Sequence, residues 1–168
     1  MAIREIITIG HPTLARKASP VENIDGHIIE LARDMVETMH QAPGIGLAAP
    51  QVNESLRLIT VDLSVGKNRD DLFIMINPEI LESEGEQVSE EGCLSVPGIY
   101  EKVVRPRKIL VRGYNLDGRE IRLEAEDLLA RVFCHEIDHL EGKLFIDRLS
   151  PLKRRLLRSR LKKQLEKD

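Results

Sequence analysis

Apolar residues in the stretch 25–41 recur at the spacing of an α-helix. They are Ile28, Leu31, Ala32, Met35, Val36 and Met39. Positions three or four residues apart share one face of a helix, so these side chains form a single apolar stripe. Pro43 and Gly44 follow, and both residue types end helices. The pattern predicts an amphipathic helix over residues 25–41 that buries one face.

Two later stretches, 56–63 and 73–76, alternate apolar and polar positions and are rich in β-branched residues. Such alternation is typical of strands. Asn77 and Pro78 predict a turn directly after the second stretch, because both residue types favour turns.

Residues 108–114 and 120–123 show the same alternation on either side of Asp117 and Gly118. An Asp-Gly pair between two such runs favours a hairpin, whose turn then fixes the strand register. Together with the earlier strands, this order of segments predicts an antiparallel sheet.

A second helical pattern covers residues 125–141. Glu126 and Asp127 place negative charge in its first turn, and Gly142 stands at the position of a C-terminal cap. Its apolar residues are Leu128, Leu129, Val132, Phe133 and Leu140. Amphipathic helices normally bury such a stripe, so most of it is best explained as core.

Residues 44–51 join the first helix to the first strand and read Gly-Ile-Gly-Leu-Ala-Ala-Pro-Gln. Glycines and small residues allow another chain to approach the backbone closely. The alternative is an ordinary connecting loop.

The composition limits which classes of protein this chain can belong to. With 168 residues, 19.1 kDa and 42% hydrophobic residues, the chain can bury one core, and we expect a single domain over residues 1–168. The net charge of −3 gives no overall bias toward nucleic acid. Two cysteines and no secretion signal point to the cytoplasm. No apolar run is long enough to span a bilayer, so we expect no membrane partner.

The strongest chemical signal is His135-Glu136-Ile137-Asp138-His139. On a helix, this H-E-x-x-H spacing directs two imidazoles from one face toward a single metal ion, and Glu136 becomes a candidate general base. Burying a carboxylate beside two histidines costs free energy if the charge has no partner, and a bound metal ion would supply one.

A third ligand is needed, and Cys93 is the best candidate. Phe145 stands where one family of H-E-x-x-H enzymes has a third histidine, and acidic residues after Gly142 are few. Cys93 follows a glycine that permits close approach, and its thiolate is a soft ligand. One cysteine and two histidines leave one coordination position open.

Three segments now resemble the motifs of the peptide deformylase family, in the same order. Residues 44–51 resemble G-x-G-L-A-A-x-Q, residues 91–95 resemble E-G-C-L-S, and residues 135–140 resemble H-E-x-D-H-L. The resemblance covers essentially the whole chain. It implies an α+β fold with mainly antiparallel β-sheets packed around a central H-E-x-x-H helix, an N-terminal helix and a C-terminal basic helix. Cys134, where relatives often have glutamine, is expected to be a small packed residue.

The resemblance also implies a reaction: hydrolysis of the N-formyl group from the initiator methionine of nascent polypeptides, with release of formate. The implied cofactor is one divalent ion, Fe²⁺ in most of the family, held by Cys93, His135 and His139. Zn²⁺, Ni²⁺ and Co²⁺ suit the same donors. A metal-bound water would attack the formyl carbon, with Glu136 as general base and then general acid.

Further roles carried over from the family concern the substrate. The side-chain amide of Gln51 and the backbone N–H of Leu94 would stabilise the developing oxyanion. The residues expected to bind the methionyl peptide are Gly44, Ile45, Gly46, Leu128 and Val132. The plainer interpretations are a polar loop cap for Gln51 and ordinary core for the apolar residues.

Two charged features stay open at this stage. The family pattern pairs Glu91 with Arg105, whereas two solvated charges are the alternative. Asp138 either orients a ligand histidine or is an exposed helix residue.

The last stretch, 151–168, combines eight Lys and Arg residues with regularly spaced leucines. This predicts a basic amphipathic helix. In similar deformylases such a helix contacts the ribosome near the exit tunnel; a solvated helix docked by its leucines is the alternative. We expect N-formylmethionyl peptides as substrates and a monomer. The competing functions are a general endopeptidase and a non-catalytic ribosome-docking protein with a structural metal site.

Overall fold

A computed structural model describes the backbone of residues 2–167 and the side chains of residues 2–163. The helices are α1 (Gly26–Gln41), α2 (Asp127–Leu140) and α3 (Pro151–Lys167). The strands are β1 (Gly46–Ala48), β2 (Leu58–Asp62), β3 (Leu72–Glu84), β4 (Gln87–Cys93), β5 (Val96–Arg105), β6 (Lys108–Tyr114) and β7 (Glu120–Glu126). Short 3₁₀ turns are η1 (Pro12–Ala15), η2 (Ala49–Val52), η3 (Arg69–Asp71) and η4 (Phe145–Arg148).

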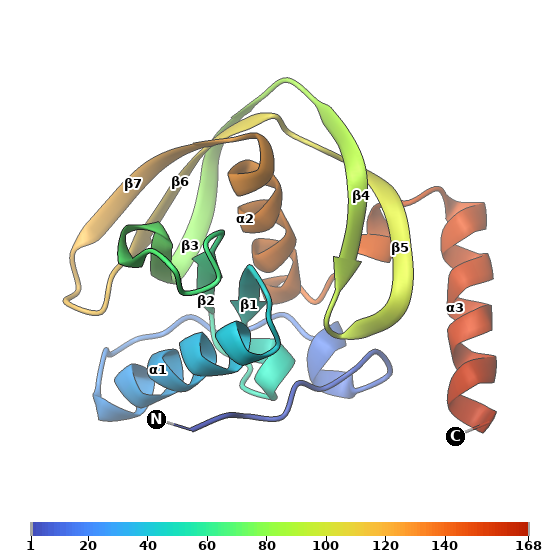
Figure 1. Cartoon of the computed structure of the whole chain (residues 1–168), viewed down its shortest axis with the longest axis horizontal. Helices are drawn as coiled ribbons and strands as arrows, with labels where there is room; N and C mark the ends of the chain where they lie inside the picture. Colours follow the sequence, from blue (N-terminus) through green and yellow to red (C-terminus); the bar gives the residue numbers. More distant parts are fainter. Residues whose placement is uncertain (1, 168) are drawn as a thin grey trace.

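The strands form two antiparallel sheets, which confirms the expected α+β class. One sheet has five strands in the order β1-β2-β3-β6-β7, and β4 and β5 form a separate hairpin. Figure 1 shows α2 between the five-stranded sheet on one side and the β4–β5 hairpin on the other, with α3 beside β5. The H-E-x-x-H helix is therefore enclosed by both sheets.

Helix α1 forms as its periodicity predicts. The Asp25 side chain caps it by accepting a hydrogen bond from the Ile28 N–H at 3.1 Å. Its apolar stripe packs with residues of β1 and β2 in one buried cluster, which includes Leu31, Met35 and Met39. The cluster therefore packs α1 against β1, which contains part of the segment 44–51.

The hairpin at residues 117–118 is confirmed. Strands β6 and β7 pair antiparallel from Lys108–Glu126 to Tyr114–Glu120, and Gly118 adopts a left-handed φ of 80°. Glycine accepts this conformation without steric cost, which is why the turn forms there.

The prediction of a turn at Asn77-Pro78 is wrong. Strand β3 continues through both residues, and its pairing with β6 is irregular between Ile76 and Glu79. Asn77 takes a φ of 50°, and its side chain bonds the Val21 N–H and C=O at 2.9 and 3.0 Å. Asparagine tolerates the left-handed conformation, so this irregularity accommodates proline without ending the strand.

Residues 44–51 are not a plain loop. Residues 46–48 form β1, whose Gly46 lies opposite Val61, and residues 49–52 form η2. Strands β4 and β5 were not anticipated, because β4 begins in a charged stretch in which only Glu91 is buried. An exposed strand such as β4 carries little apolar alternation, and β5 buries apolar residues only at uneven spacing.

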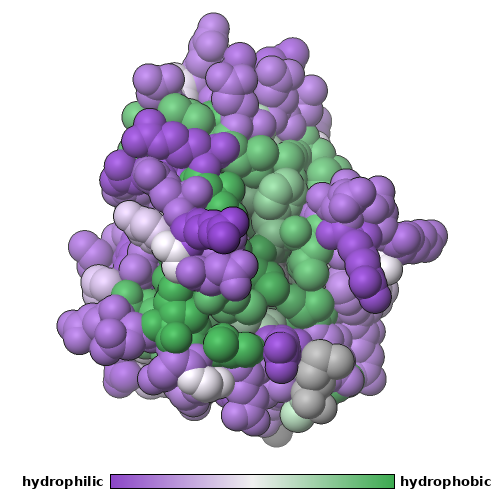
Figure 2. Space-filling model, turned by 90° about the vertical axis from the view of Figure 1, so that its left-hand side faces the viewer, coloured by the Kyte–Doolittle hydropathy of each residue, from purple (hydrophilic) through white to green (hydrophobic). Residues whose placement is uncertain are grey.

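Helix α2 is the most buried helix. Phe133 and Leu140 are fully enclosed, and its last turn ends at Gly142, whose φ of 75° fits the expected C-terminal cap. Among residues 2–163 no helix is long and apolar enough to cross a membrane. Figure 2 shows hydrophobic residues gathered in the middle of one face, surrounded by hydrophilic ones.

Candidate active site

The three expected metal ligands lie together. Cys93 ends β4, whereas His135 and His139 lie one turn apart on α2, and their ligand atoms are within 4.8 Å of one another. Cys93 Sγ is 3.4 Å from His139 Nε2. Residues more than 40 positions apart in the sequence thus present one thiol and two imidazoles to a common point.

This group fits a divalent metal ion. Glu136 Oε1, beside the group, is buried without a hydrogen-bond partner in the described part of the chain, which is unusual for a polar atom. A sulfur and two imidazole nitrogens are a donor set that zinc and iron accept, with a position left for water. Cys134 does not belong to the group: it packs in the core, and burial raises its pKa to about 11.

Glu91 orients His135. Its Oε1 lies 3.0 Å from His135 Nδ1, which leaves the other ring nitrogen for the ligand group. Arg105 holds Glu91 through two bonds of 2.9 Å, so the expected ion pair is confirmed and buried. Burial would raise the pKa of Glu91, but its bonds to His135 and Arg105 outweigh burial and lower it to about 2.

Asp138 has a different role from both of those considered. It is buried and bonds Arg105 Nη1 at 2.6 Å and Arg148 Nη2 at 2.6 Å, rather than a histidine or solvent. Asp138 therefore holds the arginine that holds Glu91. Helix periodicity alone does not identify such a partner, because both arginines come from other segments.

Glu136 lies beside the ligand group and is 4% exposed. Burial raises the pKa of its carboxyl group to about 7. A Cβ atom on Gly46 would lie 2.5 Å from Glu136 Oε2 and 2.8 Å from Val132 Cγ1. The glycine of β1 therefore makes the space that the carboxylate occupies.

Gln51 is buried in η2 with its amide aligned toward Cys93. Its Oε1 accepts a hydrogen bond from the Ala48 N–H at 3.0 Å, which leaves Nε2 directed at Ser95 Oγ (3.1 Å) and Cys93 Sγ (3.6 Å). The oxygen acts as the loop cap that the plainer interpretation suggested, while the nitrogen faces the site. Leu94, the next residue after Cys93, is 36% exposed.

A cavity of about 530 Å³ opens onto this group. All five residues expected to bind substrate line it: Gly44, Ile45, Gly46, Leu128 and Val132. Gln51, Leu94 and the candidate ligands Cys93 and His135 line it too, whereas His139 is not part of the lining. Leu128 is half exposed, so it belongs to the cavity wall rather than to the core.

Tyr100 and Arg131 are among the cavity-lining residues that sequence reasoning missed. Tyr100 is 64% exposed, and its ring lies 2.5 Å from where a Gly92 Cβ would be. Arg131 stands four residues before His135, hence on the same face of α2. That spacing was the available signal for Arg131.

Comparisons with known proteins agree on one family. Residues 3–155 match the family model described as polypeptide deformylase. The chain is 51% identical over 166 residues to a peptide deformylase of Syntrophobacter fumaroxidans, covering 99% of this chain and 98% of that protein. It is 50% identical over 163 residues to one of Acidobacterium capsulatum, covering 97% and 96%.

Solved structures give the same result. A peptide deformylase from Legionella pneumophila superposes with a TM-score of 0.90 at 45% identity, covering 98% of this chain and 96% of that one. One from Ehrlichia chaffeensis, in complex with actinonin, gives 0.88 at 36% identity and covers 98% of both chains. The motifs, the fold and these relatives together establish that the chain belongs to the polypeptide deformylase family.

Proposed function

We propose that this protein removes the N-formyl group from the initiator methionine of nascent polypeptides and releases formate, the reaction named for its family. The observation that carries the proposal is the meeting of Cys93, His135 and His139 beside the buried Glu136. The described residues supply three grouped donors rather than four. This favours a catalytic site over a structural metal site, which is usually closed by four ligands.

Cys93, His135 and His139 are the proposed ligands of one divalent ion. When bound, such an ion supplies Lewis acidity toward water and the formyl oxygen. We propose Fe²⁺ as the native ion, following the family that the motifs resemble. Zn²⁺, Ni²⁺ and Co²⁺ would accept the same sulfur and nitrogen donors.

Glu136 is the proposed proton carrier. Its unpartnered Oε1 is free to accept a proton from the attacking water, and the carboxyl group can then donate it to the leaving amide nitrogen. Its raised pKa, caused by burial, suits a group that must both take and give a proton near neutral pH.

Gln51 and Leu94 are the proposed oxyanion donors. The Ala48 N–H fixes the oxygen end of the Gln51 amide, so its NH₂ group is held toward Cys93 before substrate arrives. Donors fixed in advance cost no reorganisation when charge develops. The Leu94 N–H follows directly in the chain after the proposed ligand Cys93.

The cavity is the proposed methionine site. Ile45, Leu128 and Val132 supply apolar surface for the side chain, while Gly44 and Gly46 expose backbone groups that suit an extended peptide. Backbone pairing does not depend on sequence, so one site would serve many nascent chains.

We further propose that residues 1–168 form one catalytic domain that acts as a monomer, because ligands and cavity lining come from a single chain. Residues 151–168 would be its basic C-terminal helix and would contact the ribosome. We propose that the reaction takes place in the cytoplasm, where nascent chains are available as substrates.

The test is formate release from formyl-Met-Ala-Ser by anaerobically purified protein loaded with Fe²⁺ or Ni²⁺, beside acetyl-Met-Ala-Ser. We expect release from the formyl peptide only. Glu136→Gln should lower the rate by about 10²–10⁴-fold while metal content stays unchanged, since this residue moves the proton and is not a ligand.

Glu126→Gln is the matched control, because Glu126 is an exposed carboxylate that precedes the same helix. It should leave the rate unchanged. A metal-loaded protein that releases no formate from the formyl peptide would contradict the proposed function.

A further inference from the structure

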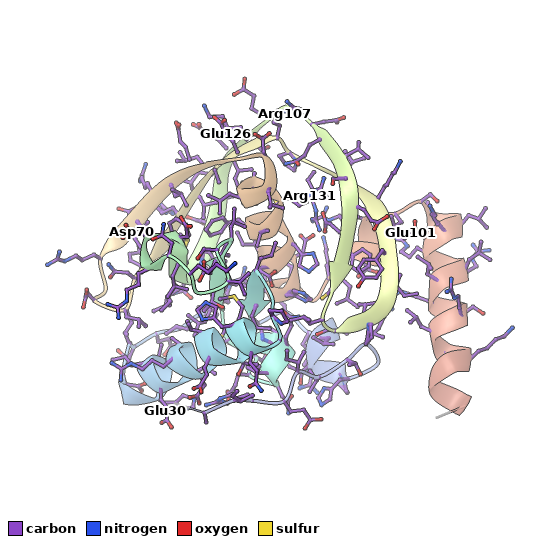
Figure 3. All side chains as sticks on the ribbon, viewed as in Figure 1. Glu30, Asp70, Glu101, Arg107, Glu126 and Arg131 are labelled. Carbon is purple, nitrogen blue, oxygen red and sulfur yellow. The ribbon has the colours of Figure 1, made fainter. Side chains whose placement is uncertain are left out.

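Arg131 is a buried arginine outside all three family motifs. It lies on α2, one turn before His135, and is 4% exposed. Figure 3 shows its side chain directed from α2 toward the β4–β5 hairpin. A buried guanidinium is rare unless its charge is paired.

Arg131 joins three elements through its terminal nitrogens. Nη1 donates to the Glu91 carboxylate and to the Ser89 carbonyl (3.3 Å), both on β4, and Nη2 donates to the Val103 carbonyl (3.1 Å) on β5. Its Nε has no partner among the described side chains. The side chain is therefore fixed by the hairpin alone, and it ties the hairpin to α2.

The Glu91 carboxylate is the centre of these contacts. Its Oε1 meets Arg105 Nη2 and His135 Nδ1, and its Oε2 meets Arg105 Nε and Arg131 Nη1. A carboxylate has about four lone-pair directions, so the four donors leave none free. Arg105 alone would leave one direction of Oε2 unfilled on a carboxylate that is buried.

We propose that Arg131 is a positioning residue of the metal centre. Through Glu91 it keeps His135 Nδ1 occupied and the other ring nitrogen turned toward Cys93. Through Ser89 and Val103 it holds the hairpin that carries Cys93 against the helix that carries both histidines. Partners that orient a ligand in this way affect metal affinity, although they do not touch the metal.

This inference rests on the proposed function only in requiring that Cys93, His135 and His139 bind a divalent ion. Its test therefore measures metal binding without substrate. A protein that binds metal but releases no formate would contradict the proposed function and leave the role of Arg131 measurable.

The experiment titrates metal-free Arg131→Met with Co²⁺ under anaerobic conditions, in competition with a chelator. The thiolate-to-cobalt absorption band reports on the bond to Cys93. We expect the Kd to rise by about 10–100-fold and the band to weaken or shift. Arg131→Lys keeps the charge but offers one nitrogen, so its Kd should lie between wild type and Arg131→Met.

Arg57→Met is the matched control. Arg57 also donates to two backbone carbonyls, those of Ala18 and Leu140, and to one carboxylate, that of Glu141. It contacts neither Glu91 nor a ligand residue, so its loss should lower the urea midpoint of the metal-free protein without changing the Co²⁺ Kd.

Wild-type Co²⁺ affinity in Arg131→Met would overturn the proposal, as would an equal loss of affinity in Arg57→Met. The urea midpoint of each metal-free variant shows whether it is folded. If Arg131→Met does not fold, Arg131→Lys decides: a raised Kd supports the positioning role, and an unchanged Kd overturns it.

Discussion

At the scale of single residues, the Glu136 carboxylate fits in its place only because Gly46 has no side chain. The two come from β1 and α2, and the carboxylate occupies the space where any other residue at position 46 would have its Cβ. Val132, one turn before Glu136 on α2, lies against the same space. Neither backbone element can move easily, since both lie in buried clusters.

Gly46→Ala should therefore displace the Glu136 carboxylate and lower kcat/KM on formyl-Met-Ala-Ser by about 10²-fold, as expected for a catalytic group misplaced by roughly 1 Å. Gly26→Ala is the control, because no atom lies within 4 Å of the Cβ position at Gly26. Unimpaired turnover by Gly46→Ala would contradict the claim that Glu136 needs the space left by Gly46.

At the scale of elements, the turn after β2 is held by one buried carboxylate. Asp62 accepts hydrogen bonds from the N–H groups of Ser64 and Gly66 at 2.9 Å, and its Oδ2 lies 2.7 Å from His40 Nε2 at the end of α1. Val65 within this turn has a φ of 53°, which is costly for a β-branched residue. The contacts of Asp62 offset that strain and dock the turn on α1.

Burial would raise the pKa of Asp62, but the bonds from Ser64, His40 and Gly66 outweigh burial and leave the pKa below its ordinary value. A lowered folded-state pKa contributes stability above the unfolded pKa of about 4, and this contribution is lost as the pH falls through the folded pKa. Asp62→Asn should lower stability at pH 7 by about 1–3 kcal/mol and reduce the loss between pH 4 and pH 2.

Urea unfolding midpoints at pH 7, 4, 3 and 2 would measure this dependence. Asp70→Asn serves as the control, because Asp70 lies in the neighbouring turn η3 and is exposed (Figure 3). Parallel acid profiles for wild type and Asp62→Asn would contradict the role given to this carboxylate.

At the scale of the whole molecule, one face of α3 packs against the rest of the protein, and the helix also carries exposed positive charges. Leu157 and Leu161 pack into the cluster formed by β5 and η4. Lys153 pairs with Glu101 at 2.8 Å and Arg158 with Asp147 at 2.6 Å. Leu152 and Leu156 stay exposed, so the leucines dock the helix only in part.

The proposed ribosome contact should depend on the exposed cations of α3. A variant with Arg155, Arg160, Lys162 and Lys163 changed to glutamine should bind ribosomes at least 10-fold more weakly in cosedimentation, because phosphate contacts supply salt-dependent affinity. Its formate release from a tripeptide should be unchanged, since none of these residues lines the cavity.

The control removes four exposed cations elsewhere: Lys67, Arg107, Arg119 and Lys143. It makes the same change in net charge. Equal loss of ribosome binding in both variants would indicate a general charge effect and contradict a contact made by α3.

The sequence alone determined the features that depend on spacing within one segment. The bounds of α1, the Gly142 cap and the hairpin at Gly118 followed from helical or strand periodicity and turn residues. The pair His135 and His139 followed in the same way, because four residues make one helical turn. Such features need no knowledge of what packs against them.

The tertiary structure alone decided which distant groups meet. Strand β3 continues past Pro78 because Asn77 finds partners on Val21, 56 residues away. Asp138 and Arg131 gain their roles from arginine and carboxylate partners on other elements. Burying a charge is favourable only where opposite charges and hydrogen bonds converge on it, and that convergence is set by how the elements pack rather than by any local pattern.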